Sequence, residues 1–307
     1  MPISTRSHGC RPVRCPDFGL TMGSRGLSLI ELLVGLSLLA VFSTVVVGLL
    51  VQGQRSYRQQ VERVQVQANL RTGVTITVAE LRELGSSDSS GPDLLEIESG
   101  SVTYRAMRST YFVCTTPDPA SRDLEVWRVP SYGLRQLEAG RDSLLILAEN
   151  NPTRETDNAW RTAGVVSVRE GMFCPGPAEG FRIGLAGVYL AGVENGAPVR
   201  AFQVTRMLVY RDRTGQHWLG IREWRATSGW SSTQPVVGPL AMDGLRLSYL
   251  DARGERTTLP ERVALIGITL AGVSERRWLP LAGPRGLVTD SITTYVTLRN
   301  RRREESP

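Results

Sequence analysis

The chain has 307 residues, of which 41% are hydrophobic, and its formal net charge is +6. This length and composition are sufficient for one or two globular domains with a substantial core. All 36 basic residues are arginines and they are spread along the sequence. A nucleic-acid footprint requires a clustered basic face, so nucleic acid is not expected as a partner.

Residues 1–26 form a basic leader. It carries +3 of the net charge, because its single acid, Asp17, is outnumbered by four arginines: Arg6, Arg11, Arg14 and Arg25. Basic residues ahead of an apolar segment keep the amino terminus in the cytoplasm. Residues 1–21 are either a long disordered leader or precede the true start of translation; we favour a start at Met22.

An apolar run follows over residues 27–51, with one charge, Glu31. A helix of this length extends roughly 38 Å, enough to cross a bilayer core of about 30 Å. A carboxylate in a membrane helix is costly and indicates a functional role. The run is longer than the apolar part of a cleaved signal peptide and has no small-residue cleavage site at its end.

The junction Arg25-Gly26-Leu27-Ser28-Leu29-Ile30-Glu31 resembles the processing site of type IV prepilins and pseudopilins. The resemblance implies that prepilin peptidase cuts between Gly26 and Leu27, methylates the new amino terminus at Leu27, and leaves Glu31 as the fifth mature residue. Glu31 can then act as counter-ion for the amino terminus of a neighbouring subunit. Leu27 stands where the family most often has phenylalanine. A plain single-pass anchor and a cleaved signal peptide are the competing interpretations.

The helix is predicted to continue beyond the membrane, through residues 52–85. Apolar or small residues recur at three- and four-residue spacing, which predicts one apolar stripe that a globular domain covers. The residues of this stripe are Tyr57, Val61, Val64, Ala68, Thr75, Val78 and Leu81. Gly85 and the serine-rich segment after it are expected to end the helix.

Residues 86–307 are predicted to form a periplasmic, β-rich globular domain. The expected strands are 94–98, 101–107, 111–115, 124–129, 144–148, 165–169, 199–211, 218–225, 245–250, 263–271 and 289–299. Turns are predicted at 210–215, between two strands, and at 251–254, after the strand that ends at Leu250. The region from Asn150 to Pro198 is expected to be rich in loops, with a surface loop at 171–180.

Two cysteines, Cys114 and Cys174, lie beyond the leader. A translocated domain in an oxidising compartment permits a disulfide between them. The alternative is a pair of buried free thiols, because sequence alone does not place the two side chains near each other.

Later segments resemble PilW-type minor pilins and the related GspJ-type pseudopilins. The matching segments are Ala79–Gly85, Met242–Asp251, Leu259–Val263 and Tyr295–Arg301. The resemblance implies an α+β, pilin-like fold, in which a long amino-terminal helix packs on a mainly antiparallel β domain. The stretch from Cys114 to Pro198 contributes nothing to this likeness.

The sequence shows no catalytic motif. His8 lies in the leader, so His217 is the one histidine of the remaining chain, and neither a nucleophile elbow nor a phosphate-binding loop occurs. Asp88 and Asp93 lack the spacing of a calcium loop. We therefore expect no enzyme, no cofactor and no metal.

The expected function is that of a minor, PilW-like type IV pilin in the inner membrane and then in a pilus. Its expected partners are prepilin peptidase, other major and minor pilins, and the inner-membrane assembly platform. One alternative is a GspJ-like pseudopilin of a type II secretion system, and another is a membrane-anchored periplasmic binding or enzyme domain.

Overall fold

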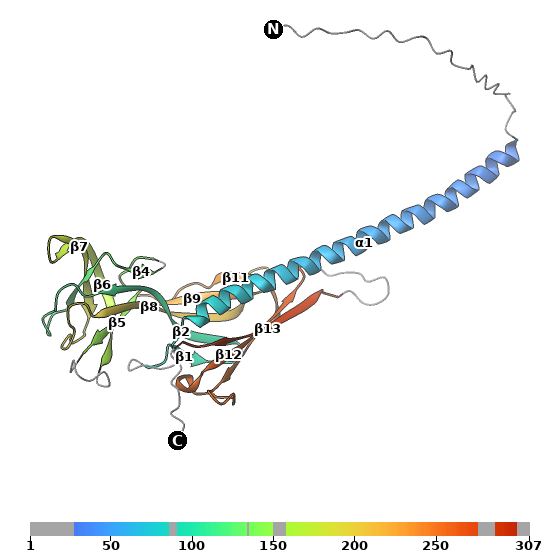
Figure 1. The fold of residues 1–307 in the computed structure, drawn as a ribbon. Helices are drawn as coiled ribbons and strands as arrows, with labels where there is room; N and C mark the ends of the chain where they lie inside the picture. Colours follow the sequence, from blue (N-terminus) through green and yellow to red (C-terminus); the bar gives the residue numbers. More distant parts are fainter. Residues whose placement is uncertain (1–27, 86–90, 134, 150–157, 276–285, 300–307) are drawn as a thin grey trace, which may run out of the picture. The chain divides into compact units, whose positions relative to one another are not determined.

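The computed structural model describes residues 28–85, 91–133, 135–149, 158–275 and 286–299 (Figure 1). The chain divides into two compact units, Met1–Ser56 and Tyr57–Pro307. Helix α1 (Leu29–Arg82) contributes to both, so its two parts are described separately below.

Helix α1 has 54 residues, equivalent to about 81 Å at 1.5 Å per residue. It continues through Gly73 and the β-branched residues that follow, although both lower helix propensity. Packing explains Gly73: a Cβ there would lie 2.5 Å from Val237 Cγ1 and 3.0 Å from Leu270 Cδ1. Glycine therefore permits close contact between the helix and the strands beneath it.

Thirteen strands follow in the described residues. They are β1 (Leu94–Ile97), β2 (Ser101–Phe112), β3 (Asp123–Trp127), β4 (Tyr132–Gly133), β5 (Ser143–Ala148), β6 (Ala159–Cys174), β7 (Ala178–Ala186), β8 (Pro198–Arg211), β9 (His217–Arg225), β10 (Gly229–Trp230), β11 (Gln234–Leu250), β12 (Leu265–Val273) and β13 (Thr289–Thr297). A short 3₁₀ helix, η2 (Pro260–Arg262), lies between β11 and β12.

The strands form one open sheet in the order β13-β12-β11-β9-β8-β5-β6-β7-β3, and all strand pairs among the described residues are antiparallel. Strand β2 also pairs with β8 and carries β1 and β4, while β10 pairs with β9. The chain is thus an α+β protein: one long amino-terminal helix and an antiparallel sheet.

The carboxy-terminal part of α1 packs on this sheet. Its buried positions are Val66, Leu70, Gly73, Thr77 and Leu81. They join a core cluster that includes residues of β2, β11, β12 and β13. Burial of this face supplies most of the stability of such a helix, because intrinsic propensity contributes little.

Polar contacts complement this packing. Gln67 Nε2 donates to Asp290 Oδ2 at 2.9 Å, and Asn69 Nδ2 donates to the carbonyl of Gly238 at 2.9 Å. On β2, the hydroxyl of the fully buried Tyr104 donates to Glu80 Oε2 at 3.3 Å. Burial is the main reason why the pKa of Tyr104 lies well above its usual value, and the negative charge of Glu80 raises it further.

A second core cluster lies between β3, β5, β6, β7 and neighbouring parts of β2 and β8. It includes Tyr111 and Phe181, whose rings meet edge to face at 5.8 Å between centroids. An ion pair, Arg135 to Asp142, lies in the same half of the sheet, and the Asp142 side chain is almost fully buried. The sheet therefore has one core under α1 and another beyond it.

The predicted apolar stripe of the helix is wrong at its first residues but right at its end, where Leu81 is fully buried and Val78 packs against the core. Tyr57, Val61 and Val64 are 69%, 50% and 65% exposed, whereas Val66 and Leu70 are 4% and 0% exposed. At about 100° per residue, the two sets lie on opposite sides of the helix. The buried face is the one that carries Gly73, because the missing side chain at Gly73 lets this face approach the strands closely.

The region predicted to be rich in loops contains two strands, so that prediction is also wrong. Strand β6 extends to Cys174, and β7 begins at Ala178 inside the predicted surface loop. Its glycines are sites of close strand contact: a Cβ on Gly180 would lie 2.6 Å from Cys174 Sγ, and one on Gly184 would lie 2.4 Å from Ser167 Oγ. The predicted strands also miss the first half of β11, residues 234–244.

Both predicted turns are confirmed. Asp212 N donates to Gln216 O in the β8–β9 hairpin, where Gly215 has φ +87°. Asp251 N donates to Glu255 O after β11, where Gly254 has φ +81°. Positive φ is unfavourable for residues with a Cβ, so glycine suits both turns.

The two sides of α1 predict opposite responses to truncation. Leu70→Ala should lower the free energy of unfolding by about 3 kcal/mol, because it removes buried methyl groups and leaves a cavity. Val64→Ala, on the exposed side, should change it by less than about 0.5 kcal/mol. Urea unfolding of the full chain in detergent measures both. A similar loss for the two variants would contradict the assignment of the buried face.

Candidate functional site

The candidate site is helix α1 itself, because its surface is apolar where a soluble protein is usually polar. The predicted cleavage residues, Gly26 and Leu27, lie outside the described residues. The description begins at Ser28, and Glu31 lies in the first turn of α1. A carboxylate in the first turn interacts favourably with the helix dipole, which moderates its cost in an apolar segment.

The part of α1 from Leu29 to Val51 has the properties of a membrane span. It is long and apolar enough to cross a bilayer, and its side chains are exposed in the structure. Two of its three hydroxyls bond within the helix, since Ser37 Oγ donates to Val34 O at 2.8 Å and Thr44 Oγ1 donates to Val41 O at 2.7 Å. Such bonds make polar residues tolerable in lipid.

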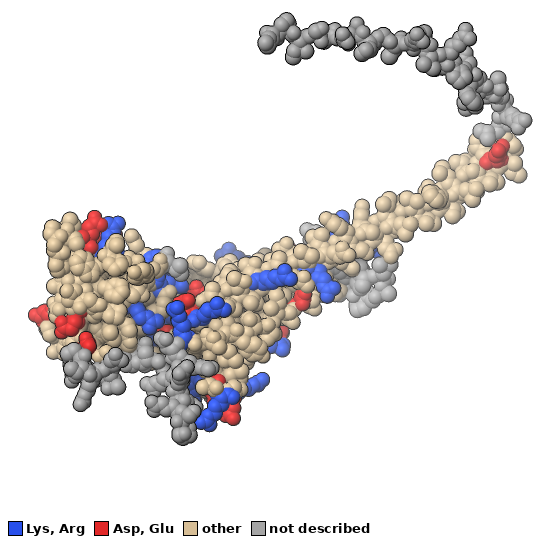
Figure 2. All heavy atoms as spheres, viewed as in Figure 1, with Lys and Arg blue, Asp and Glu red and all other residues tan. Residues whose placement is uncertain are grey.

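Glu31 is the one charged residue of this apolar part (Figure 2). Among the residues that the structure describes, its carboxylate makes no hydrogen bond or ion pair. An ionised group in an apolar environment is strongly stabilised by a partner of opposite charge. The carboxylate is therefore available to a cation from outside the described chain.

Beyond the span, α1 retains a second apolar stripe, formed by Tyr57, Val61 and Val64. We call it the outer stripe, because these residues face away from the sheet that covers Val66 and Leu70. Exposed apolar residues that follow one another at helical spacing indicate contact with a further partner. Sequence periodicity placed these residues on one side of the helix but predicted that the domain covers them, whereas the domain covers the other side.

The described residues of the β domain do not bring metal-ligating side chains together. No group of three or more His, Cys, Asp or Glu side chains is placed to hold a metal ion among them. His217 begins β9 and pairs with Arg211 in a hairpin. Asp93 accepts a hydrogen bond from Gly85 N at 2.7 Å beside the end of α1, while Asp88 lies outside the described residues.

An open groove with a volume of about 730 Å³ lies along β11. Its ionisable side chains are few, and two of them, Asp243 and Arg246, form an exposed ion pair. Tyr249 lines it, but its hydroxyl donates to the carbonyl of Glu98 at 3.1 Å. Glu98 and Arg256 also line the groove.

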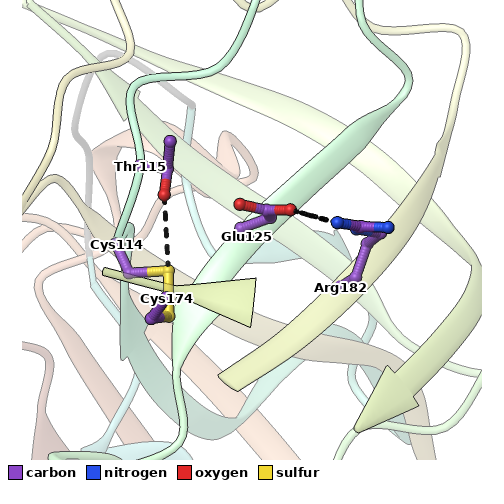
Figure 3. The surroundings of a disulfide bond; sticks show 5 residues. All are labelled: Cys114, Thr115, Glu125, Cys174 and Arg182. Carbon is purple, nitrogen blue, oxygen red and sulfur yellow. Dashed lines mark hydrogen bonds and ion pairs between the residues drawn. A yellow bond between two sulfur atoms is a disulfide. The ribbon is translucent and has the colours of Figure 1, made fainter. Parts of the chain in front are cut away.

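A disulfide joins Cys114 and Cys174, with 5.5 Å between their Cα atoms (Figure 3). It connects the segment after β2 to the end of β6, 60 residues later. Nearby, Arg182 Nη2 donates to Glu125 Oε1 at 2.7 Å and holds β7 against β3. The disulfide and the ion pair stabilise the edge of the second core. The two cysteines are buried and bonded to each other, so they lack the exposed thiol of a redox site.

Comparison with family models, with curated proteins and with solved structures found no match to this chain. The functional interpretation therefore depends on the residues and geometry described above.

Removal of the disulfide should destabilise the β domain. Closing a loop of 60 residues contributes about 4 kcal/mol in the chain-entropy model. Cys114→Ser with Cys174→Ser should lose a stability of this order, measured by urea unfolding of oxidised and variant chains. Reduced wild type is the control for the substitutions themselves, because it lacks the bond but keeps both cysteines. If oxidised wild type, reduced wild type and the double variant were equally stable, the prediction would be contradicted.

Proposed function

We propose that this chain is a minor, PilW-like subunit of a type IV pilus, incorporated through α1 and without enzymatic activity. One observation carries the proposal: outside its apolar span, α1 still has the exposed outer stripe, while its own domain covers the opposite side. A membrane anchor alone has no use for that stripe. A helix that leaves the membrane and packs among other helices does.

Processing follows from the resemblance at the amino terminus. Prepilin peptidase cuts after Gly26 and methylates Leu27, which removes the basic leader and creates a charged amine at the start of the apolar helix. The helix holds the subunit in the inner membrane, with its β domain in the periplasm, until assembly. The subunit then moves laterally from lipid into a bundle of similar helices.

Glu31 supplies the register of assembly. A carboxylate inside an apolar bundle is stabilised when it meets a positive charge at a short distance. In the proposed filament, that charge is the amino terminus of a neighbouring subunit. Because the two groups are four residues apart in each chain, only one axial offset between neighbours pairs them, and the pair thereby selects that offset.

Glu31→Ala should separate membrane insertion from assembly. The variant should insert and be cut, because the apolar run and Gly26 are unchanged, yet it should enter filaments at a level at least about tenfold lower, equivalent to about 1.4 kcal/mol. Mass spectrometry of sheared filaments measures incorporation and also shows whether wild-type chains begin with methylated Leu27. Ser37→Ala, in the same span, is the control and should assemble normally. If Glu31→Ala assembled normally, the proposed pairing of Glu31 with a neighbour's amino terminus would be contradicted.

The outer stripe should be needed for assembly and not for folding. Val61→Gln changes an exposed side chain, so the stability of the chain should stay within about 0.5 kcal/mol of wild type. Its amide should disturb a helix–helix contact, and incorporation into filaments should fall several-fold. Glu62→Gln, at the adjacent position, is the matched control. Equal incorporation of both variants would remove the observation on which the proposed function rests.

A further inference from the structure

The edge strand β13 has a row of open backbone hydrogen-bonding groups. It is the outermost strand of the sheet, and all nine of its residues pair with β12 in an unbroken antiparallel register, from Thr289 with Val273 to Thr297 with Leu265. Two backbone hydrogen bonds just after β13 show which residues direct their N–H and C=O groups away from β12. Leu298 N donates to Ala264 O on the β12 side, and Arg299 N donates to Leu84 O on the outer side.

Because the direction of backbone groups alternates along a strand, the odd-numbered residues of β13 face outward. The amide of Ser291 is satisfied by the Asp290 side chain at 2.8 Å. The amides of Thr293, Tyr295 and Thr297 have no acceptor among the described residues. The open part of the edge therefore runs from Thr293 to Thr297, next to the position where Leu84 already uses the same edge.

The strand lacks the features that usually protect an edge. Proteins commonly place lysine, proline, bulges or very short strands at such positions. β13 has nine residues without a bulge, six of them are Thr, Ile or Val, and Asp290 is its one charged residue. Tyr295 is 61% exposed on the face away from α1. A regular, uncharged and β-branched edge of this kind favours the addition of another strand.

We infer that the Thr293–Thr297 edge of β13 is a docking site for an extended strand of a different polypeptide, which continues the sheet. A second copy of this chain is the less suitable occupant. The strand at the other end of the sheet, β3, has its outer edge covered, because Cys114 N donates to Glu125 O and Val113 bridges to Val126. Copies therefore cannot extend the sheet from β13 to β3.

Self-pairing of β13 would also reverse the helix. Two identical strands related by a two-fold axis pair antiparallel, with the axis perpendicular to the sheet. The segments of α1 that lie on the sheet, residues 57–82, would then run in opposite directions. Subunits assembled side by side from one membrane have parallel helices. This step rests on the proposed function, and it assigns the site to a different subunit of the same assembly.

The chemistry of β13 defines its partner strand. On the α1 side the partner meets Ile292 and the buried Val296, which favour β-branched apolar residues. On the other side it meets Thr293 and Tyr295, which favour Ser, Thr or aromatic residues. Near Asp290 it should carry a neutral or basic residue, because like charges across a strand pair are destabilising.

A proline at Thr293 tests the site selectively. The amide of Thr293 faces away from β12, so Thr293→Pro removes one outward donor and leaves the β12 ladder intact. Thr293→Val retains the amide and is the matched control. Both full-length chains should unfold like wild type in detergent, while amounts of Thr293→Pro recovered in sheared filaments should fall at least about fivefold relative to Thr293→Val. Equal recovery of a folded Thr293→Pro chain overturns the inference.

Amide exchange then locates the effect and separates it from the proposed function. In the detergent-solubilised chain, the amides of Thr293, Tyr295 and Thr297 should exchange at least about tenfold faster than those of Ile292, Thr294 and Val296. In filaments the two sets should be similarly protected. Incorporated chains whose odd-numbered amides still exchange rapidly overturn the docking site. If the chain is absent from filaments, the proposed function is contradicted. The docking site is then tested in native membranes, where rapid exchange of the amides of Thr293, Tyr295 and Thr297 would overturn it as well.

Discussion

The requirement to cover the apolar surface of α1 governs the rest of the structure. Over residues 29–51 that surface surrounds the helix. Beyond it lie two stripes on opposite sides, the exposed one at Tyr57, Val61 and Val64 and the buried one from Val66 to Leu81. The sheet covers one stripe through Leu70 and its neighbours. The first part is long and apolar enough to cross a membrane, and in the proposed function the outer stripe packs against neighbouring helices. Each segment of one helix thus specifies a different environment, and the β domain supplies only one of them.

Glycine permits the close contacts through which the domain covers its stripe. Gly73 brings the helix near Val237 and Leu270, and Gly272 on β12 lies against Val66 and Leu70. Removing both Cβ atoms lets the helix lie low enough for Leu70 to be fully buried. Gly272 leaves the surface of the sheet flat where the helix crosses it, and Gly73 leaves the helix narrow at its own point of contact. This geometry explains why the face with weaker helix propensity, and not the more regular outer stripe, meets the sheet.

Much of the fold was accessible from the sequence, because its signals are local. The apolar run, the end of the helix near Gly85 and the turns at Gly215 and Gly254 follow from hydropathy and backbone preference. The missed elements depend on contacts distant in sequence. Strand β7 needs a glycine at position 180 because Cys174 leaves no room there for a side chain. The burial of one side of α1 likewise involves the close contact between Gly73 and Val237. For the site, the sequence singled out Glu31 and offered a Cys114–Cys174 disulfide as one of two possibilities, but it placed the stripe of Tyr57, Val61 and Val64 against the domain and could not show the open edge of β13.

The outer stripe and the β13 edge make different demands on a neighbour. An apolar helical stripe accepts partners over a range of rotations and offsets, because dispersion and the hydrophobic effect are weakly directional. A row of backbone amides accepts only a strand in register, since each hydrogen bond loses strength rapidly with misalignment. A subunit with both surfaces can associate first through its helix and then select its neighbour through its edge. In the proposed assembly, Glu31 imposes a similar electrostatic choice at the other end of α1. There the helix supplies affinity, and the few polar groups near it determine which arrangement of neighbours is stable.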